Sequence, residues 1–206
     1  MSEELIKHLG PLGPLAGKWE GDKGDDIAPD DDKVSEEKNK FREEMIFEPM
    51  GPVNNHEQTL YGLRYSLTAY RIETGDAFHE DRGYYLWDPE NKQAMRCTIV
   101  PRGVSLIAGA TVEPDAKEFD LIAEVGSETY GICSNKFLDE EFKTIRFEMK
   151  ITIHNNDSFS YDQDTQIQIK GNPNLFHHTD KTLSAEWVNF HLRFSYSSFF
   201  QCITCT

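Results

Sequence analysis

The segment Thr144-Ile-Arg-Phe-Glu-Met-Lys-Ile-Thr-Ile-His154 decides the fold, because apolar and polar residues alternate through its whole length. Alternation with a period of two is the pattern of a β-strand that has one buried face and one wet face. Residues 159–170 repeat the alternation, and Asn155-Asn156-Asp157 separates the two segments. Asn and Asp tolerate the positive φ angles that tight turns require. The two segments are therefore predicted to form an antiparallel hairpin.

The same alternation continues on both sides of this hairpin, with short turns such as Thr74-Gly75-Asp76 between the alternating stretches. The expected strands are residues 15–21, 39–48, 61–69, 78–87, 95–100, 104–108, 119–123, 144–154, 159–170 and 176–187. About ten strands, each wet on one side, bury their other sides most simply by closing into an up-and-down antiparallel β-barrel. A flat sandwich is the alternative. An eight-stranded barrel already has room for one small ligand, so this all-β barrel is expected to enclose a cavity.

Three stretches interrupt this rhythm. Residues 2–8 are predicted to form a short N-terminal helix, capped by Ser2 and ended by Gly10-Pro11, which could cover one barrel end. Residues 22–38 carry eight acids and almost nothing apolar, which predicts an acidic flexible loop. The spacing of a calcium-binding EF-hand is absent from that segment. Residues 126–142 are predicted to be a second long loop, placed to close a barrel mouth.

The strands together predict one domain. All-β barrels of this size commonly stay undivided, so residues 1–187 are assigned to a single ligand-binding barrel. Residues 188–206 extend beyond the last expected strand and begin with further alternation. This C-terminal extension is interpreted either as an extra strand or as an irregular tail.

Charge restricts the classes of partner. The 206 residues include 21 basic and 36 acidic side chains, which gives a net charge of −15. A chain this acidic repels nucleic-acid phosphates and anionic membrane surfaces. The N-terminus lacks the features of a signal peptide, and no apolar run has the ~18 residues of a membrane helix. We expect a cytoplasmic protein, monomeric or homodimeric, that has no nucleic-acid or membrane partner.

The four cysteines agree with a reducing compartment. Cys97 and Cys133 lie far apart, and Cys202 and Cys205 are in the last five residues. This spacing is not that of a secreted disulfide framework. The lone C-x-x-C of the tail lacks the two further ligands of a zinc site. Neither Cys97 nor Cys133 has the neighbouring histidine of a thiolate nucleophile.

The histidines are the best candidates for a site. Adjacent residues of a strand point to opposite faces, so one of His177 and His178 should face the barrel interior. A neutral imidazole in an apolar cavity is a natural axial ligand of haem iron. The pair could instead hydrogen-bond the end of the strand. His79 lies among acids within a strand, where it is either a pocket residue or part of a polar ladder.

Three motifs resemble those of the nitrobindin-like proteins. Residues 12–24, LGPLAGKWEGDKG, resemble the family's opening L-x-x-L-x-G-x-W-x-G-x-G pattern around Trp19. Residues 78–84, FHEDRGY, look like its H-x-E-x-G-Y segment, with Asp81 in place of Glu. Residues 178–183, HTDKTL, are similar to its closing H-x-x-x-x-L segment. The order and spacing agree over most of the chain.

The resemblance implies a ten-stranded barrel related in shape to lipocalins and fatty-acid-binding proteins. It also implies haem b as cofactor, with His178 as the axial ligand of the iron and with His177, His79 and Trp19 as further candidate haem-binding residues. Family members bind nitric oxide and isomerise peroxynitrite to nitrate. This chain departs from the family in its greater length, in the doubled histidine and at Leu86, where the family often has Arg.

Three hypotheses therefore remain at this stage. The first is a haem-binding barrel that reacts with nitric oxide or related nitrogen oxides, either as a binding protein or as a peroxynitrite isomerase-like enzyme without catalytic side chains. The second is a non-haem carrier or sensor of a small apolar ligand such as a fatty acid. The third is a scaffold that interacts through its loops or tail. The closing histidine motif favours the first.

Overall fold

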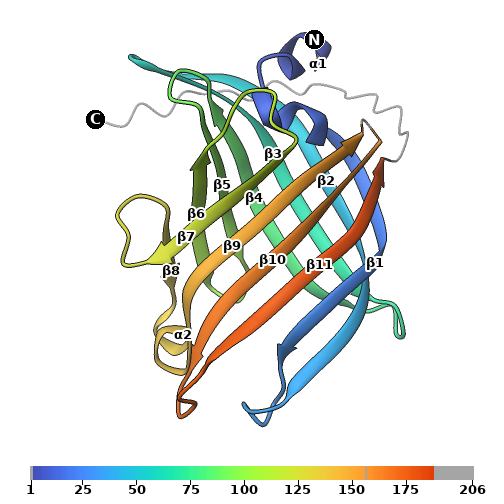
Figure 1. Ribbon diagram of the computed structural model, residues 1–206, viewed down its shortest axis with the longest axis vertical. Coiled ribbons are helices and arrows are strands. Elements are labelled where there is room, and N and C mark those ends of the chain that lie inside the picture. Colours follow the sequence, from blue (N-terminus) through green and yellow to red (C-terminus); the bar gives the residue numbers. More distant parts are fainter. Residues whose placement is uncertain (1, 156, 188–206) are drawn as a thin grey trace.

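The protein is a barrel that closes on itself (Figure 1). The computed structural model describes residues 2–155 and 157–187. In chain order the elements are α1 (Ser2–Ile6), η1 (Gly10–Leu15), β1 (Gly17–Pro29), β2 (Glu36–Asn55), β3 (Gln58–Arg71), β4 (Ala77–Asp88), β5 (Gln93–Val100), β6 (Val104–Thr111), β7 (Glu118–Val125), β8 (Gly131–Ser134), α2 (Lys136–Glu141), β9 (Phe142–Asn155), β10 (Ser158–Ile169) and β11 (Leu175–Trp187). The extension 188–206 lies outside the described residues.

Around the barrel the strands follow the order β1-β11-β10-β9-β7-β8-β6-β5-β4-β3-β2, and β2 pairs with β1 to complete the ring. Within the described part of the chain, β7 and β8 pair in parallel and the other neighbouring strands pair antiparallel. The prediction of an all-β barrel of about ten strands is confirmed, with the short β8 as the addition. Closure leaves none of the main strands as an open sheet edge.

The hairpin predicted from alternation is β9–β10. Ile151 of β9 is opposite Tyr161 of β10, and Ile153 is opposite Phe159. All four side chains are buried, because successive residues of a strand point to opposite faces and these occupy the inward one. The first and last strands close the barrel. Strand β11 pairs with β1, and Trp19 stands opposite Trp187.

Residues 22–38, predicted as an acidic loop, are mostly strand. β1 continues to Pro29 and β2 begins at Glu36, so only a short turn separates them. Lysines stabilise the strands against the acids: Lys40 is the cross-strand neighbour of Asp25 and forms an ion pair with it. The loop prediction was wrong because it rested on the number of acids alone. Lysines on the neighbouring strand offset the charge of these acids.

The second predicted loop, residues 126–142, contains β8 and α2. Strand β8 inserts between β6 and β7 and pairs with both. Helix α2 begins after Asn135, whose side-chain oxygen accepts a 3.0 Å hydrogen bond from the Leu138 backbone N–H. Leu138 and Phe142 line the interior at this end of the barrel, and the segment predicted as a loop is instead mostly ordered into β8 and α2.

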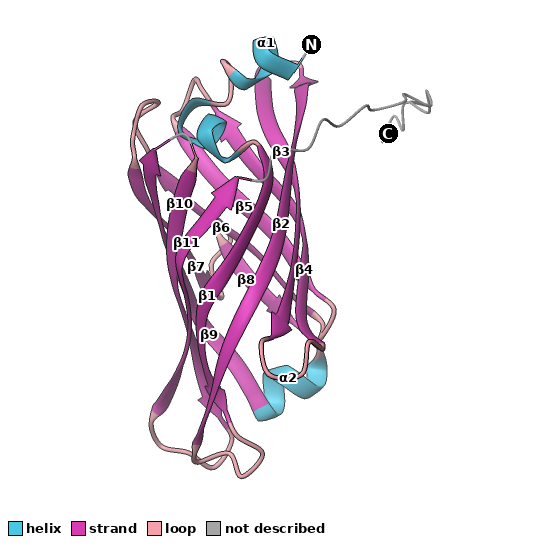
Figure 2. Cartoon of the chain, turned by 90° about the vertical axis from the view of Figure 1, so that its right-hand side faces the viewer, coloured by secondary structure: helices cyan, strands magenta, loops and turns pink. Residues whose placement is uncertain are grey.

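The opposite end is filled. In Figure 2, α1 and η1 lie at one end of the barrel and α2 at the other. Leu12 and Leu15 of η1 are fully buried, and Trp19 is 1% exposed. The Trp19 Nε1–H donates a 2.7 Å hydrogen bond to the Leu15 carbonyl. This apolar plug confines any interior space to the half of the barrel near α2.

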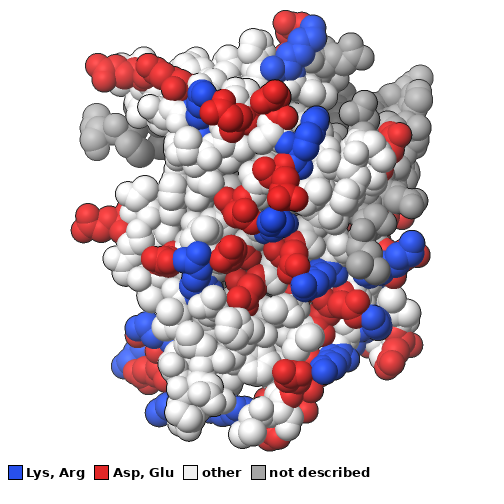
Figure 3. All heavy atoms as spheres, viewed as in Figure 1, with Lys and Arg blue, Asp and Glu red and all other residues white. Residues whose placement is uncertain are grey.

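The outer surface carries both signs of charge. Figure 3 shows basic and acidic side chains interspersed over the visible face. Lys150 forms a 3.0 Å ion pair with Glu118, and Lys181 a 2.7 Å pair with Asp162. The acidic excess is therefore not gathered in one patch on this face. Among the described residues no helix is long and apolar enough to cross a membrane.

Candidate functional site

A cavity of about 760 Å³ occupies the barrel half near α2. Part of its wall is apolar and aromatic, formed by Phe41, Leu67, Phe78, Leu138, Phe142, Phe147, Met149 and Ile167. The remainder is unusually charged for a barrel interior. Seven acids line it against three arginines: Asp26, Asp30, Asp31, Glu37, Glu80, Asp81 and Asp180, with Arg71, Arg96 and Arg102. A pocket with apolar walls and a few convergent polar groups is the usual form of a ligand site.

The deepest charged group is the ion pair between Asp81 of β4 and Arg96 of β5. Arg96 Nη2 donates a 2.7 Å hydrogen bond to Asp81 Oδ2, and each side chain is 3% exposed. The guanidinium also lies over the Tyr65 and Phe147 rings, 5.5 and 5.1 Å from their centroids. Burial works to raise the pKa of Asp81, but the Arg96 charge and a contact with His79 outweigh it and hold that pKa below its usual value.

A chain of polar groups connects this ion pair to β11. Arg96 Nη1 donates a 3.1 Å hydrogen bond to Gln163 Oε1, and Gln163 Nε2 donates a 2.8 Å bond to Asp180 Oδ2. Gln163 is on β10, where odd-numbered residues face inward. Burial raises the pKa of Asp180 to about 6, with His178 opposing and Asp26 adding to the effect. The network crosses four strands and orders the carboxylate next to His178.

His178 is the inward residue of the histidine pair. Its Nε2 is 2.9 Å from Asp26 Oδ1 and 3.8 Å from Asp180 Oδ2. Asn39 Nδ2 donates a 2.8 Å hydrogen bond to the other oxygen of Asp26. Burial opposes charge on the imidazole, but the bond to Asp26 and the Asp180 charge outweigh it and raise the pKa of His178. Burial likewise opposes the charge on Asp26, yet its bonds to His178 and Asn39 lower its pKa.

His177 points away from the cavity. Its Nδ1 is 2.8 Å from Asp164 Oδ2 on the neighbouring strand β10, and its side chain is 55% exposed. The strand alternation that predicted one inward histidine is thereby confirmed, and the inward one is His178. His177, a candidate haem-binding residue by resemblance, does not line the interior.

The other two candidates lie in different halves of the barrel. His79 lines the cavity, with its Nε2 3.6 Å from Asp81 Oδ2. Trp19 belongs to the apolar plug, where its ring packs edge-on against Phe159 at 4.9 Å between centroids. Trp19 does not line the cavity that His178 faces, because it lies seven positions before Asp26 along β1.

Sequence reasoning assigned no role in the site to Asp26, Asp81, Arg96, Gln163 and Asp180. Asp26 faces inward because β1 contains a β-bulge. Gly21 pairs with Glu43 and Gly24 pairs with Phe41, so β1 has one more residue than β2 between these two pairs. Continuing the alternation from Trp19 without the bulge would place Asp25 inside instead. The sequence contained one indication of Arg96. It lies on the same face of its strand as Ala94 and Thr98, which are both buried.

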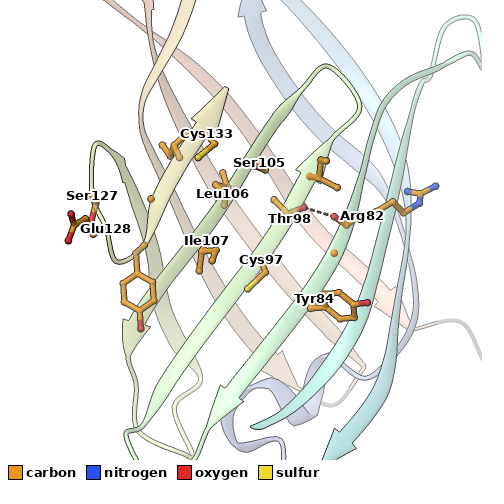
Figure 4. Close-up of a pocket in the computed structure, with 15 residues that line it drawn as sticks. Arg82, Tyr84, Cys97, Thr98, Ser105, Leu106, Ile107, Ser127, Glu128 and Cys133 are labelled. Atoms are coloured by element: carbon orange, nitrogen blue, oxygen red, sulfur yellow. Dashed lines mark hydrogen bonds between the residues drawn. The ribbon is translucent and has the colours of Figure 1, made fainter. Parts of the chain in front are cut away.

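A second hollow, of about 500 Å³, lies on the outside of the barrel and is lined mainly by residues of β4, β5, β6 and β8. Figure 4 shows Tyr84, Cys97 and Ile107 on neighbouring strands of this outer face. Burial raises the pKa of the Cys97 thiol, which makes it a poorer nucleophile. The clusters of titratable groups described above belong to the inner cavity, which is therefore the candidate site.

Comparison with known families identifies the barrel. Residues 8–184 match the model of the "THAP4-like, heme-binding beta-barrel domain". The chain belongs to this family. The match covers the plug, the cavity and His178, and it confirms the nitrobindin-like resemblance of the three motifs. Family membership supports haem as the kind of ligand that the barrel takes.

A solved structure supports the fold. The crystal structure of Rv2717c from M. tuberculosis aligns with a TM-score of 0.63 and 20% sequence identity, over 88% of this chain and 98% of that one. At this identity the likeness concerns the fold alone. No curated protein matches this sequence.

The cavity residues fit a haem in the nature of their side chains. Flat phenylalanine side chains line it, and His178 supplies an inward imidazole, the commonest kind of axial ligand. Arg71 and Arg102 line the cavity yet reach solvent, which suits them to the carboxylates of a haem edge. The fit has one condition: iron binding through Nε2 would replace the hydrogen bond between His178 and Asp26.

Proposed function

We propose that this protein binds haem b in the barrel cavity with His178 as the axial ligand, and that the bound haem reacts with nitric oxide or related nitrogen oxides. Two observations support the proposal. The family is a haem-binding one, and His178 is the one histidine of its pair that faces the cavity. Ferric haem would supply an iron that accepts the small nitrogen-oxide ligand.

The chain's own residues have three tasks in this proposal. His178 would bind the haem iron. The hydrogen bonds from Arg96 to Gln163 and from Gln163 to Asp180 order the side chains beside His178. The apolar wall excludes water, which protects a bound nitrogen oxide from competing reactions. His79 brings a second imidazole to the cavity wall, where it can donate a hydrogen bond to a ligand.

The alternative of a fatty-acid carrier is weakened by the same geometry. A fatty-acid carboxylate buried in a barrel needs a cation to offset its desolvation. Among the residues that the structure describes, the one fully buried cation is Arg96, and Asp81 already neutralises it at 2.7 Å. The cavity acids outnumber its arginines, so a further carboxylate buried beside Asp81 meets repulsion.

Haemin titration tests the proposal. The wild-type chain should give a saturable shift of the Soret band at one haemin per chain, and His178→Ala should lose this shift. His177→Ala is the matched control, because it removes the outward histidine of the same strand, and it should behave as wild type. Nitric oxide added to the ferric complex should shift the Soret band again.

Two results of the haemin titration would contradict the proposal. A His178→Ala protein that keeps the full Soret shift would show that another residue holds the iron. If the wild-type chain takes up no haemin at all, the haem proposal fails. Mass spectrometry of the natively purified protein would then identify the small apolar cargo of the second hypothesis.

A further inference from the structure

His178 and the two carboxylates beside it have the arrangement of a metal site that contains no porphyrin. One ligand atom each from Asp26, His178 and Asp180 lies within 4.8 Å of the other two. Ligands of one tetrahedral Zn²⁺ ion, each at ~2.1 Å, are about 3.4 Å apart. His178 Nε2 is 2.9 Å from Asp26 and 3.8 Å from Asp180, so both separations are within about 0.5 Å of this spacing. The two carboxylates lie within 4.8 Å of each other and need to approach by up to about 1.4 Å.

We propose that Asp26, His178 and Asp180 bind a single divalent transition cation, of the Zn²⁺ or Mn²⁺ class, directly inside the barrel. One imidazole and two carboxylates form a mixed nitrogen and oxygen donor set, which suits borderline cations. Three protein ligands leave at least one coordination position for water or substrate, as in catalytic rather than structural sites.

The backbone holds these groups rigidly. Asp26 and Asp180 are direct cross-strand neighbours in the β1–β11 pair, and His178 lies two residues from Asp180 on the same face of β11. Like charges directly opposite each other on neighbouring strands are destabilising. A metal cation between the two carboxylates removes that repulsion.

The outer partners of the carboxylates are also in place. Asn39 donates to Asp26 Oδ2 and leaves Oδ1 directed at His178, while Gln163 donates to Asp180. Outer hydrogen bonds of this kind orient ligating carboxylates in metal sites. Asn39 and Gln163 come from β2 and β10, the two strands that flank the β1–β11 pair.

A second, independent observation is an acceptor in this cavity that lacks a donor. Asp81 is 2% exposed and lines the same cavity, and its Oδ1 has no hydrogen-bond partner. A buried carboxylate oxygen without a partner is costly. A hydrated cation in the cavity brings water molecules that can donate to such an oxygen, in addition to offsetting the surplus of acids on the wall.

This site goes beyond haem binding and shares only His178 with it. Because one Nε2 cannot bind both metals, Zn²⁺ and a His178-bound haem are expected to exclude each other. Protein preloaded with Zn²⁺ should therefore lose the His178-dependent Soret shift until a chelator is added.

Cobalt titration of the metal-free full chain tests the site. Co²⁺ should produce visible d–d bands with a stoichiometry of one, and Zn²⁺ should displace it, whereas excess Ca²⁺, which prefers six to eight oxygen ligands, should not. Asp26→Asn and Asp180→Asn should each weaken Co²⁺ binding by more than the roughly 10–100-fold that loss of an outer partner costs. His178→Ala should abolish it.

The outer pair His177–Asp164 is the matched control, since it places a histidine and a carboxylate 2.8 Å apart on the solvent side of neighbouring strands. His177→Ala and Asp164→Asn should leave Co²⁺ binding unchanged. Circular dichroism checks folding, and if Asp26→Asn does not fold, the less buried Asp180→Asn decides. A rise of Tm with Zn²⁺ in wild type, absent in Asp180→Asn, gives a readout without cobalt.

The outcomes separate the two proposals. Co²⁺ binding that is equal in wild type and Asp180→Asn, or no Co²⁺ binding by the folded wild type, overturns the metal site. A His178-dependent Soret shift together with no Co²⁺ binding overturns the metal site alone. Carboxylate-dependent Co²⁺ binding together with no haemin uptake supports the metal site and overturns the haem proposal alone.

Discussion

Arg96→Met is expected to destabilise the barrel by about 3–5 kcal/mol, because it leaves the Asp81 carboxylate buried without its counter-ion. Asp81 is 2% exposed, so its carboxylate stays largely desolvated once the guanidinium is gone. Gln163 Oε1 loses its donor in the same change. Urea unfolding followed by circular dichroism measures the loss as a shift of the midpoint.

Two further variants show whether the loss comes from the unpaired charge. The double variant Asp81→Leu with Arg96→Met removes both charges and should be far more stable than Arg96→Met alone. Arg64→Met, which breaks the exposed 3.1 Å pair with Glu48, should cost under about 1 kcal/mol. If the double variant is as unstable as the single one, lost packing around Arg96 explains the effect instead.

Glu43→Gln is expected to stabilise the protein at alkaline pH and to have little effect in acid. Burial raises the pKa of Glu43 from 4.5 to about 7, although a 2.6 Å hydrogen bond from the Tyr161 hydroxyl opposes the rise. The folded state therefore favours the protonated form. Its contribution to stability is fully present below about pH 4.5 and is lost as the pH rises through 7. A pKa about 2.5 above the ordinary value corresponds to roughly 3 kcal/mol.

Stability curves of the two proteins give the measurement. The difference in free energy of unfolding between Glu43→Gln and wild type should grow by roughly 3 kcal/mol from about pH 4.5 to about pH 8. The comparison cancels the groups that titrate in this range independently of Glu43. Glu44→Gln is the control, because Glu44 is the outward neighbour that pairs with Arg42 at 3.0 Å. Parallel curves for Glu43→Gln and wild type would show that Glu43 is ionised at an ordinary pKa.

The strands were predictable because each depends on local alternation. The β9–β10 hairpin needs only an inward apolar set and a turn that tolerates positive φ, and both are visible in adjacent residues. The same reasoning placed one histidine of the 177–178 pair inside. It could not place β8, because a strand of four residues is too short to show a periodic pattern. This strand forms because β6 and β7 both offer unpaired backbone groups beside it.

The site was predictable only in its histidine. Asp26 and His178 are 152 positions apart, and their contact exists because the first and last strands close the ring. The acids of residues 22–38 suggested a solvated loop, since composition does not show which acid of a strand turns inward.

The sequence by itself determined the class of architecture, the β9–β10 hairpin and the inward direction of one histidine. These follow from periodicity and motif order, which are properties of neighbouring residues. Only the tertiary structure decided which carboxylates face that histidine. The bulge between Gly21 and Gly24 reverses the two faces of β1, and barrel closure then sets Asp26 opposite Asp180. A single extra residue in one strand thus changes what the cavity can bind, because side-chain direction in a strand alternates with every residue.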